Sequence, residues 1–239
     1  MKINKFTYQK PDSDGEIRFD CSAIVENKTD FDIELVRTSI IIVNGSNVTV
    51  CGYENESDSD FISAKDSAEV DVAGWLSCDA RTLNGSGENA KAYVSVVTYK
   101  REFVKIGQLP FPAKPGDYTE INKVVSLGGV ADLMGVSCLR KKDEDGSAQL
   151  EMRSAIRNSS KDYIARAQLD VKLLDQRDAE ITESYDYYSL PSKASQVYNP
   201  SFWDLKPKKC VNANFNISAS VYTPVERYTA EASATLSED

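Results

Sequence analysis

Apolar and polar residues alternate along most of this chain with a period of two. Two segments far apart in the sequence show the alternation clearly, with apolar side chains at Phe19, Cys21 and Val25 and then at Leu150, Met152 and Ile156. A period of two is typical of a β-strand with one buried face. Turn-forming stretches such as DSDG, ENKTD and VNGSN separate the segments. The pattern predicts an all-β protein built from short strands and tight turns.

The second half of the chain repeats the first at an offset of 131 residues, which sets Gly15 against Gly146 and Asn27 against Asn158. The same offset aligns alternate positions of a later strand: Val36, Thr38, Ile40 and Ile42 with Ala167, Leu169, Val171 and Leu173. Chance matches would not respect one buried face through two strands and their turns. The repeat predicts two tandem immunoglobulin-like β-sandwich domains.

Prolines in the stretch LPFPAKPG mark a boundary in the middle of the chain. The predicted domains are therefore residues 1–116 and 117–239. Each is expected to close with a long hairpin, the first turning at KRE after AKAYVSVVTY and the second at TPVE after NANFNISASVY. Trp75 and Trp203, at similar places in the two copies, are expected to lie in the cores.

One segment of each copy resembles a known kind of sandwich module. SAIRNSSKDYIARAQLDVKLLD is similar to FxLYD-type and late-embryogenesis-abundant-type modules, with a short strand, an Asn-Ser turn and a long amphipathic strand that ends near an Asp. SAIVENKTDFDIELVRTSIIIVNG follows the pattern more loosely, and the chain lacks the aromatic-Leu-Tyr-Asp signature. The resemblance implies a non-enzymatic module of surface or stress proteins, and it brings no functional residues with it.

Composition narrows the choice of partners. The 239 residues include 37 acidic and 28 basic side chains, giving a net charge of −9 at pH 7. Such a charge opposes binding to nucleic acid or to an anionic membrane. No apolar run is long enough for a membrane helix, and the start of the chain shows no signal peptide. We therefore expect a cytoplasmic or virion-associated protein that binds neither nucleic acid nor membranes.

The residue types that are missing exclude much chemistry. The chain has no histidine, which removes Ser-His-Asp and Cys-His nucleophile systems and histidine-bound metals. It also lacks glycine-rich phosphate-binding motifs. Its five cysteines show no C-x-x-C spacing, so we expect mostly reduced, buried thiols rather than a zinc site, with one inter-strand disulfide as the alternative. The N-x-[ST] sequons are expected to be polar turn and strand-edge residues. We predict no cofactor, no metal and no catalysis.

Two short segments are candidate binding surfaces. ENESDSD places carboxylates at alternate positions, Glu54, Glu56, Asp58 and Asp60. On one side of an extended loop these residues suit calcium, but a solvated loop or a charged edge strand explains them as well. YDYYSL brings Tyr185, Tyr187 and Tyr188 together, with the first two on one strand face. Exposed, these rings suit a sugar or a protein partner, and buried they would fill a sandwich face.

These observations favour a non-enzymatic structural or adaptor protein that binds other proteins through its sandwiches. By analogy at the level of the fold, a virion accessory or decoration protein fits this description. Homo-oligomerisation is compatible with it. The alternative is a carbohydrate- or calcium-binding module that uses the tyrosines or the acidic run.

Overall fold

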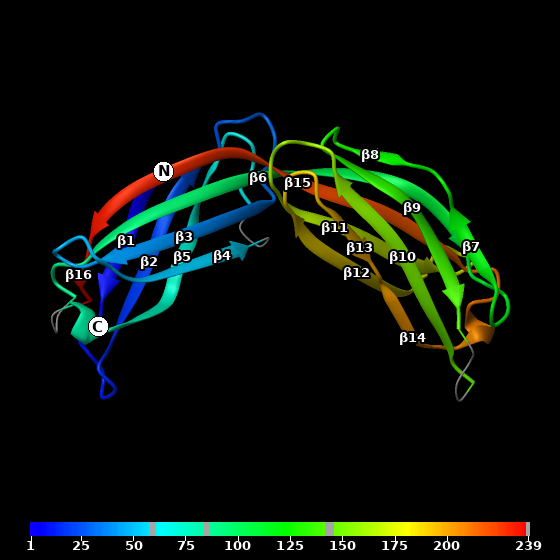
Figure 1. The fold of residues 1–239 in the computed structure, drawn as a ribbon, viewed down its shortest axis with the longest axis horizontal. Coiled ribbons are helices and arrows are strands. Elements are labelled where there is room, and N and C mark those ends of the chain that lie inside the picture. The colour runs from blue at the N-terminus through cyan, green and yellow to red at the C-terminus, as the bar shows by residue number, and fades with distance from the viewer. Residues whose placement is uncertain (58–60, 84–86, 142–145, 238–239) are drawn as a thin grey trace. The chain divides into compact units, whose positions relative to one another are not determined.

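The computed structural model describes residues 1–57, 61–83, 87–141 and 146–237. Strands make up most of these residues, and the helical elements among them are two short 3₁₀ turns, η1 (Ala80–Leu83) and η2 (Pro207–Lys209) (Figure 1). None of the described helices has the length and apolarity needed to span a bilayer. The predicted all-β class is confirmed.

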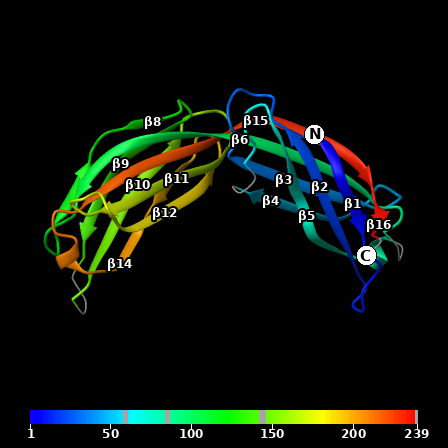
Figure 2. The ribbon, with the colours of Figure 1, turned by 180° about the vertical axis from the view of Figure 1, so that it is seen from behind.

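Two compact units, each with its own hydrophobic core, make up the chain. Unit 1 comprises Met1–Lys100 and Pro224–Asp239, and unit 2 comprises Arg101–Thr223. These bounds differ from the predicted 1–116 and 117–239, because the C-terminal segment belongs to unit 1. There β16 (Thr235–Leu236) pairs in parallel with β1 (Lys2–Tyr8) (Figure 2).

Two strands of 20 residues explain this division: β6 (Lys91–Pro110) and β15 (Asn214–Ser233). Both predicted closing hairpins are wrong, because each strand runs straight through the segment expected to turn. KRE contains no Gly, Asn or Pro to favour a turn. β6 and β15 are neighbours in one sheet, so each strand contributes one half to unit 1 and the other half to unit 2.

Unit 1 is a sandwich of two sheets. The first has the order β16-β1-β2-β5, with β2 at Glu16–Glu26 and β5 at Ser67–Asp79. In the second, β3 (Leu35–Val43) lies between β4 (Thr49–Ser57) and the first half of β6, and the second half of β15 follows.

Unit 2 is also a sandwich of two sheets, with six strands in its first sheet where unit 1 has four. Its first sheet contains β7, β8, β9, β10, β13 and β14, at Tyr118–Ile121, Val125–Leu127, Ala131–Arg140, Ala148–Asn158, Ser195–Tyr198 and Ser201–Leu205. Its second sheet runs from β12 (Glu180–Leu190) through β11 (Ile164–Leu174) to the first half of β15 and the second half of β6. β10, β11 and β12 thus correspond to β2, β3 and β4, as the sequence repeat predicts for immunoglobulin-like sandwiches.

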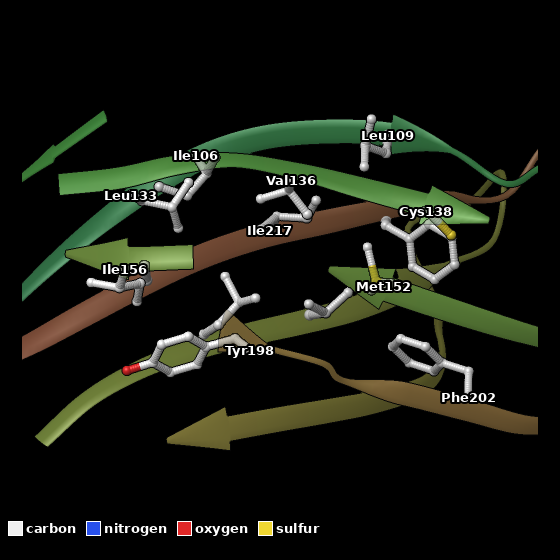
Figure 3. Packing of buried hydrophobic residues seen from close by; sticks show 14 of the residues in the cluster. Ile106, Leu109, Leu133, Val136, Cys138, Met152, Ile156, Tyr198, Phe202 and Ile217 are labelled. Atoms are coloured by element: carbon white, nitrogen blue, oxygen red, sulfur yellow. The ribbon is translucent and has the colours of Figure 1, made fainter. Parts of the chain in front are cut away.

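The cores follow the predicted alternation. The predicted positions that are buried are Phe19, Cys21, Val25, Ile40, Ile42, Leu150, Met152, Ile156, Leu169 and Val171. Figure 3 shows how Leu133, Val136 and Met152 of one sheet of unit 2 pack in a single cluster with Ile106 and Ile217 of the other. This cluster is the hydrophobic interior that holds the two sheets together.

The prediction for Trp203 is wrong, because its side chain is 64% exposed. Successive residues of a strand face opposite sides, and on β14 the inward position belongs to Phe202. The Phe202 ring lies 5.4 Å from that of Phe215 across the core. For Trp75, the prediction concerns a side chain that lies outside the described part of the structure.

A buried asparagine organises one corner of unit 2. The carboxamide nitrogen of Asn158 donates hydrogen bonds to three backbone carbonyls, those of Asp162 (2.8 Å), Leu190 (3.0 Å) and Pro191 (3.1 Å). Its Oδ1 accepts from the backbone N–H of Ser160 (2.9 Å) and from the Ser160 hydroxyl (2.7 Å). The side chain thereby joins the end of β10 to the turn that follows it and to the end of β12.

Asn27 makes the equivalent set of bonds in unit 1. Its Nδ2 donates to the carbonyls of Phe31, Ile62 and Ser63, at 2.8, 3.1 and 3.1 Å. Its Oδ1 accepts from the backbone N–H and the hydroxyl of Thr29, at 3.0 and 2.6 Å. In these two sequons the third residue serves the turn, and the asparagine side chain is buried.

The 131-residue offset also holds at a later turn. Asn44 Oδ1 accepts the backbone N–H groups of Ser46 and Val48, and Asp175 Oδ1 accepts those of Arg177 and Ala179. Within these turns Asn47 and Asp178 adopt left-handed backbone conformations, with φ of 59° and 60°. The two copies therefore share turn geometry as well as strand register.

The cysteines fall into two groups. Cys51 on β4 and Cys78 on β5 form a disulfide between the two sheets of unit 1, whereas Cys21, Cys138 and Cys210 are buried thiols. The expectation of reduced thiols fits the second group, and the disulfide alternative applies to the first. Burial raises the pKa of Cys21 and of Cys138 to about 12, so neither is poised as a nucleophile.

Substitution of the adjacent aromatic residues on β14 should separate core from surface. Phe202→Ala is expected to lower the free energy of unfolding by about 3–5 kcal/mol, because it leaves a cavity in the core. Trp203→Ala should lower it by less than about 1 kcal/mol, because the ring is exposed. Urea denaturation of both variants measures the difference, and equal losses would contradict the assignment.

Removal of the Asn158 carboxamide should be costly. Asn158→Ala removes the donor to the buried carbonyl of Leu190 and to two partly buried carbonyls, so we expect a loss of about 3 kcal/mol in the free energy of unfolding. Asn199→Ala, at an exposed position in the same unit, is the control and should change it by less than about 0.5 kcal/mol. Similar stabilities for the two variants would show that the corner does not depend on this side chain.

Candidate ligand-binding groove

The tyrosines of YDYYSL lie on β12, the edge strand of unit 2. Tyr185 is 62% exposed and Tyr187 is 48% exposed, and their stacked rings lie 6.2 Å apart. They share a strand face as predicted, but the interpretation that they fill the core is wrong. At the two ends of the strand Ile181 and Leu190 pack against the core instead. The side chains of Tyr185 and Tyr187 therefore lie on the outer face of the sheet.

Tyr188 lies on the other side of the same strand. It pairs with Ala167, and its ring meets that of Tyr198 edge-on at 5.2 Å. The nearby carboxylate of Asp186 raises the pKa of the Tyr188 hydroxyl. Tyr188 therefore belongs to the rim of the sandwich and does not extend the outer aromatic surface.

A hollow of about 510 Å³ crosses this outer face, and we call it the unit 2 groove. Four neighbouring strands line it: β12 with Glu183, Ser184 and Tyr185, β11 with Asp170, Val171 and Lys172, β15 with Asn216, Ile217 and Ser218, and β6 with Arg101, Phe103, Lys105, Gly107 and Gln108. Tyr185 and Phe103 stand on the two outermost strands, whose backbones are about 14 Å apart at three strand spacings. Two exposed rings thus flank a polar floor.

The backbone of β6 shapes one side of the groove. Gly107 has a φ of 151°, a conformation that favours glycine. It lies between Ile106 and Leu109, which are both buried although three residues apart. This irregularity interrupts the alternation and lets Lys105 and Gln108 both reach the groove.

Most charges of the groove are paired within it. Lys172 lies 2.9 Å from both Glu180 and Glu183, and the hydrogen bonds that its amine donates to these carboxylates raise the pKa of Lys172. Asp170 accepts a hydrogen bond of 2.6 Å from Gln168 and lies 3.7 Å from the guanidinium of Arg101. The floor therefore offers hydrogen-bond donors and acceptors with little net charge.

Arginines and aromatic rings alternate beside the groove. The guanidinium carbon of Arg166 lies 4.6 Å from the ring centre of Tyr187 and 5.7 Å from that of Tyr222. That of Arg101 lies 5.9 Å from Tyr222 and 5.5 Å from Phe103. Such cation–π contacts restrict the rings, so Phe103 is held in place before any ligand arrives.

The acidic run is only partly described. Glu54 lies on the edge strand β4, and its carboxylate pairs with Arg37 at 2.8 Å. Glu56 stands opposite Arg37 in the strand pairing, but its side chain lies outside the described part, as do Asp58 and Asp60 entirely. The described residues contain no group of three or more Cys, Asp or Glu side chains arranged to hold a metal ion. A charged edge strand accounts for Glu54, and calcium binding by the run stays a hypothesis.

The two candidate segments occupy the same place in the two repeats. Ser39 pairs with Glu54 in unit 1, and Asp170 pairs with Tyr185 in unit 2. The offset of 131 residues aligns Glu54 with Tyr185, so this equivalence could be predicted from the sequence. Phe103 and Asp170 were missed, because only the continuation of β6 into unit 2 brings Phe103 beside the other three strands.

Comparisons with known proteins give no family assignment. No sequence-family profile matches the chain, and no curated protein matches it in sequence. The chain is similar in structure to pT26-6p, with 6% identity, a TM-score of 0.30 and coverage of 98% of this chain and 62% of that one. It is also similar to the CBM22-1-CBM22-2 tandem domain of Paenibacillus barcinonensis Xyn10C, with 7% identity, a TM-score of 0.27 and coverage of 96% and 98%.

A third similar structure is Bacteroides uniformis β-glucuronidase, with 11% identity and a TM-score of 0.31. The likeness covers 92% of this chain but only 26% of that enzyme. All three similarities are too low to carry an argument about function. The resemblance to FxLYD-type and late-embryogenesis-abundant-type modules stays a hypothesis.

One serine beside the groove should be replaceable with a gain in stability. Ser220 is fully buried on the outer side of β15, and its hydroxyl has no hydrogen-bond partner within the described part of the chain. Ser220→Ala should therefore raise the free energy of unfolding by about 0.5–1 kcal/mol. Ser218→Ala, two residues away in the groove floor, should change it by less than about 0.5 kcal/mol. A clear loss of stability for Ser220→Ala in urea denaturation would contradict this prediction.

Proposed function

We propose that this chain is a non-enzymatic binding protein and that its unit 2 groove takes a carbohydrate chain. The observation that carries the proposal is the pair of exposed rings, Tyr185 and Phe103, on either side of a polar floor. Sugar rings present C–H faces that pack on aromatic side chains and hydroxyls that bond to amides, hydroxyls and paired charges. The groove supplies both kinds of group.

The charge of the site favours a neutral sugar chain over an acidic one. The protein carries a net charge of −9, which repels polyanions. In the groove, Lys172 is paired with two glutamates and Arg101 lies beside Asp170. Paired charges can still donate and accept hydrogen bonds, and hydroxyl groups use both.

The proposal includes no chemical step. The chain has no histidine, and its buried thiols have raised pKa values. Among the described carboxylates, those with shifted pKa values, such as Glu151 and Asp175, have those values lowered by hydrogen bonds at the surface. A general acid would need a raised pKa instead. These observations support binding without turnover.

A second candidate is the adaptor role, in which the protein binds another protein, for example in a virion. The outer side of the other sheet of unit 2 favours it, because a hollow of about 310 Å³ there is lined by Tyr118, Met134 and Val197. All three side chains are exposed. Apolar surface of this kind is typical of protein contacts. A cytoplasmic or virion-associated location belongs to this candidate.

Binding to neutral polysaccharides tests the leading proposal. Affinity electrophoresis in soluble β-1,4-glucan, xylan, mannan and starch should show retardation of the wild-type protein in at least one gel. Tyr185→Ala and Phe103→Ala should each weaken that retention about ten-fold, because each removes one side of the groove. Tyr118→Ala, an exposed tyrosine on the other sheet, is the matched control and should bind like the wild type.

The outcomes separate the two candidates. Retention that survives both groove substitutions would place the sugar elsewhere and contradict the proposal. Retention in none of the gels would reject carbohydrate binding. Capture of a native partner that is lost in Met134→Glu and kept in Tyr185→Ala would then establish the adaptor role.

A further inference from the structure

A second hollow of about 420 Å³ lies on the outer face of unit 1. Three strands line it: β3 with Ser39 and Ile41, β6 with Tyr93, Val94 and Ser95, and β15 with Thr229, Ala230 and Glu231. Tyr93 is 43% exposed and Ile41 is 47% exposed, and the two residues are paired neighbours on adjacent strands. A ring and an aliphatic side chain therefore form one accessible surface.

The hollow occupies the position of the unit 2 groove in the repeat. Ser39 pairs with Ser95 as Asp170 pairs with Ser218, and both pairs line their hollows. Two residues further along the strands, Ile41 pairs with Tyr93 in unit 1, and Lys172 pairs with Asn216 at the equivalent place in unit 2. The same register thus produces two hollows, with a ring in the floor of one and rings at the sides of the other.

The edge strand leaves the unit 1 surface open. Gly52 on β4 stands opposite Ile41, whereas Glu183 on β12 stands opposite Lys172 in unit 2. Without a side chain at Gly52, nothing from that position of β4 covers Ile41. The surface formed by Ile41 and Tyr93 is therefore accessible from the side of β4.

The chemistry of the lining fits an uncharged, hydroxyl-bearing ligand. Three hydroxyl-bearing residues, Ser39, Ser95 and Thr229, line the hollow together with Tyr93. Glu231 is the single charged residue in the lining, and its carboxylate pairs with Lys91 at 3.2 Å. Since this charge is compensated, the hollow offers no partner to an ionic ligand, and it combines stacking surface with hydrogen-bonding groups.

We propose that the unit 1 hollow is a second carbohydrate-binding site, in which Tyr93 stacks on a sugar ring of the same neutral class of ligand. The inference rests on the proposed function, and it adds that each repeat carries its own site. The protein would then be bivalent, and two sites on one chain raise the avidity for a polymer that presents repeated sugars.

Fluorine NMR of the protein labelled with 3-fluorotyrosine reports on each site separately. Signals of Tyr93, Tyr185 and Tyr53 are assigned with single Tyr→Phe variants, and cellohexaose, xylohexaose, mannohexaose and maltohexaose are titrated in turn. With at least one sugar, the Tyr93 and Tyr185 signals should both shift and saturate. Tyr53, exposed in unit 1 but outside the hollow, is the control and should not move. Tyr93→Ala should weaken binding at the unit 1 site at least about ten-fold and leave the Tyr185 titration unchanged.

The results distinguish the second site from the groove. A shift of Tyr185 alone would overturn the second site and leave the groove in place. A shift of Tyr93 alone would support the unit 1 site and overturn the assignment of the groove. Equal shifts of Tyr93 and Tyr53 would indicate a non-specific effect and overturn the second site. No shift with any of the four sugars would overturn both.

Discussion

A buried carboxamide that bonds three backbone carbonyls fixes one corner of each sandwich. Asn158 and Asn27 stand at the ends of β10 and β2, where the chain turns toward the second sheet. The bonds to the carbonyls of Leu190 and Ile62 are buried, and buried carbonyl groups need a hydrogen-bond donor. Because one carboxamide bonds three carbonyls from separate segments, the turn, the strand end and the opposite segment are held in a single arrangement. The strands β3 and β11 follow these turns and begin at Leu35 and Ile164.

A fixed frame leaves the outer faces free to differ. β3 and β11 bury the same alternate positions, yet their outward neighbours on β4 and β12 are Glu54 in one unit and Tyr185 in the other. The first is held by an ion pair with Arg37, and the second stands beside a hollow. A core permits few substitutions, because its volume is filled, whereas an outward position on a strand accepts either type. The repeat therefore conserves architecture while the two surfaces acquire separate chemistry.

Local patterns in the sequence were sufficient to predict the strands, the two cores and the repeat, because period-two burial and turn residues are properties of neighbouring residues. The path of β6 and β15 was not predictable in this way. Nothing near Lys100 says whether the strand turns back or continues, since that choice depends on pairing with a strand more than a hundred residues away. The prediction for Trp203 was wrong for a related reason. Phe202 and Trp203 are both large, and only the register of β14 decides which of them faces inward.

The groove exists because β6 continues past KRE into unit 2. Had β6 turned at KRE, the residues after Lys100 would have lain in unit 1, and Phe103 would not share a sheet with Tyr185. The continuation of β6 places Arg101 and Phe103 beside β15 in unit 2, where Arg101 stacks near both Phe103 and Tyr222. The residues that line the groove come from four strands. The two strands on opposite sides of the groove, β6 and β12, are far apart in the sequence. A short motif can therefore reveal one side of such a site, as YDYYSL does, and only the fold supplies the other.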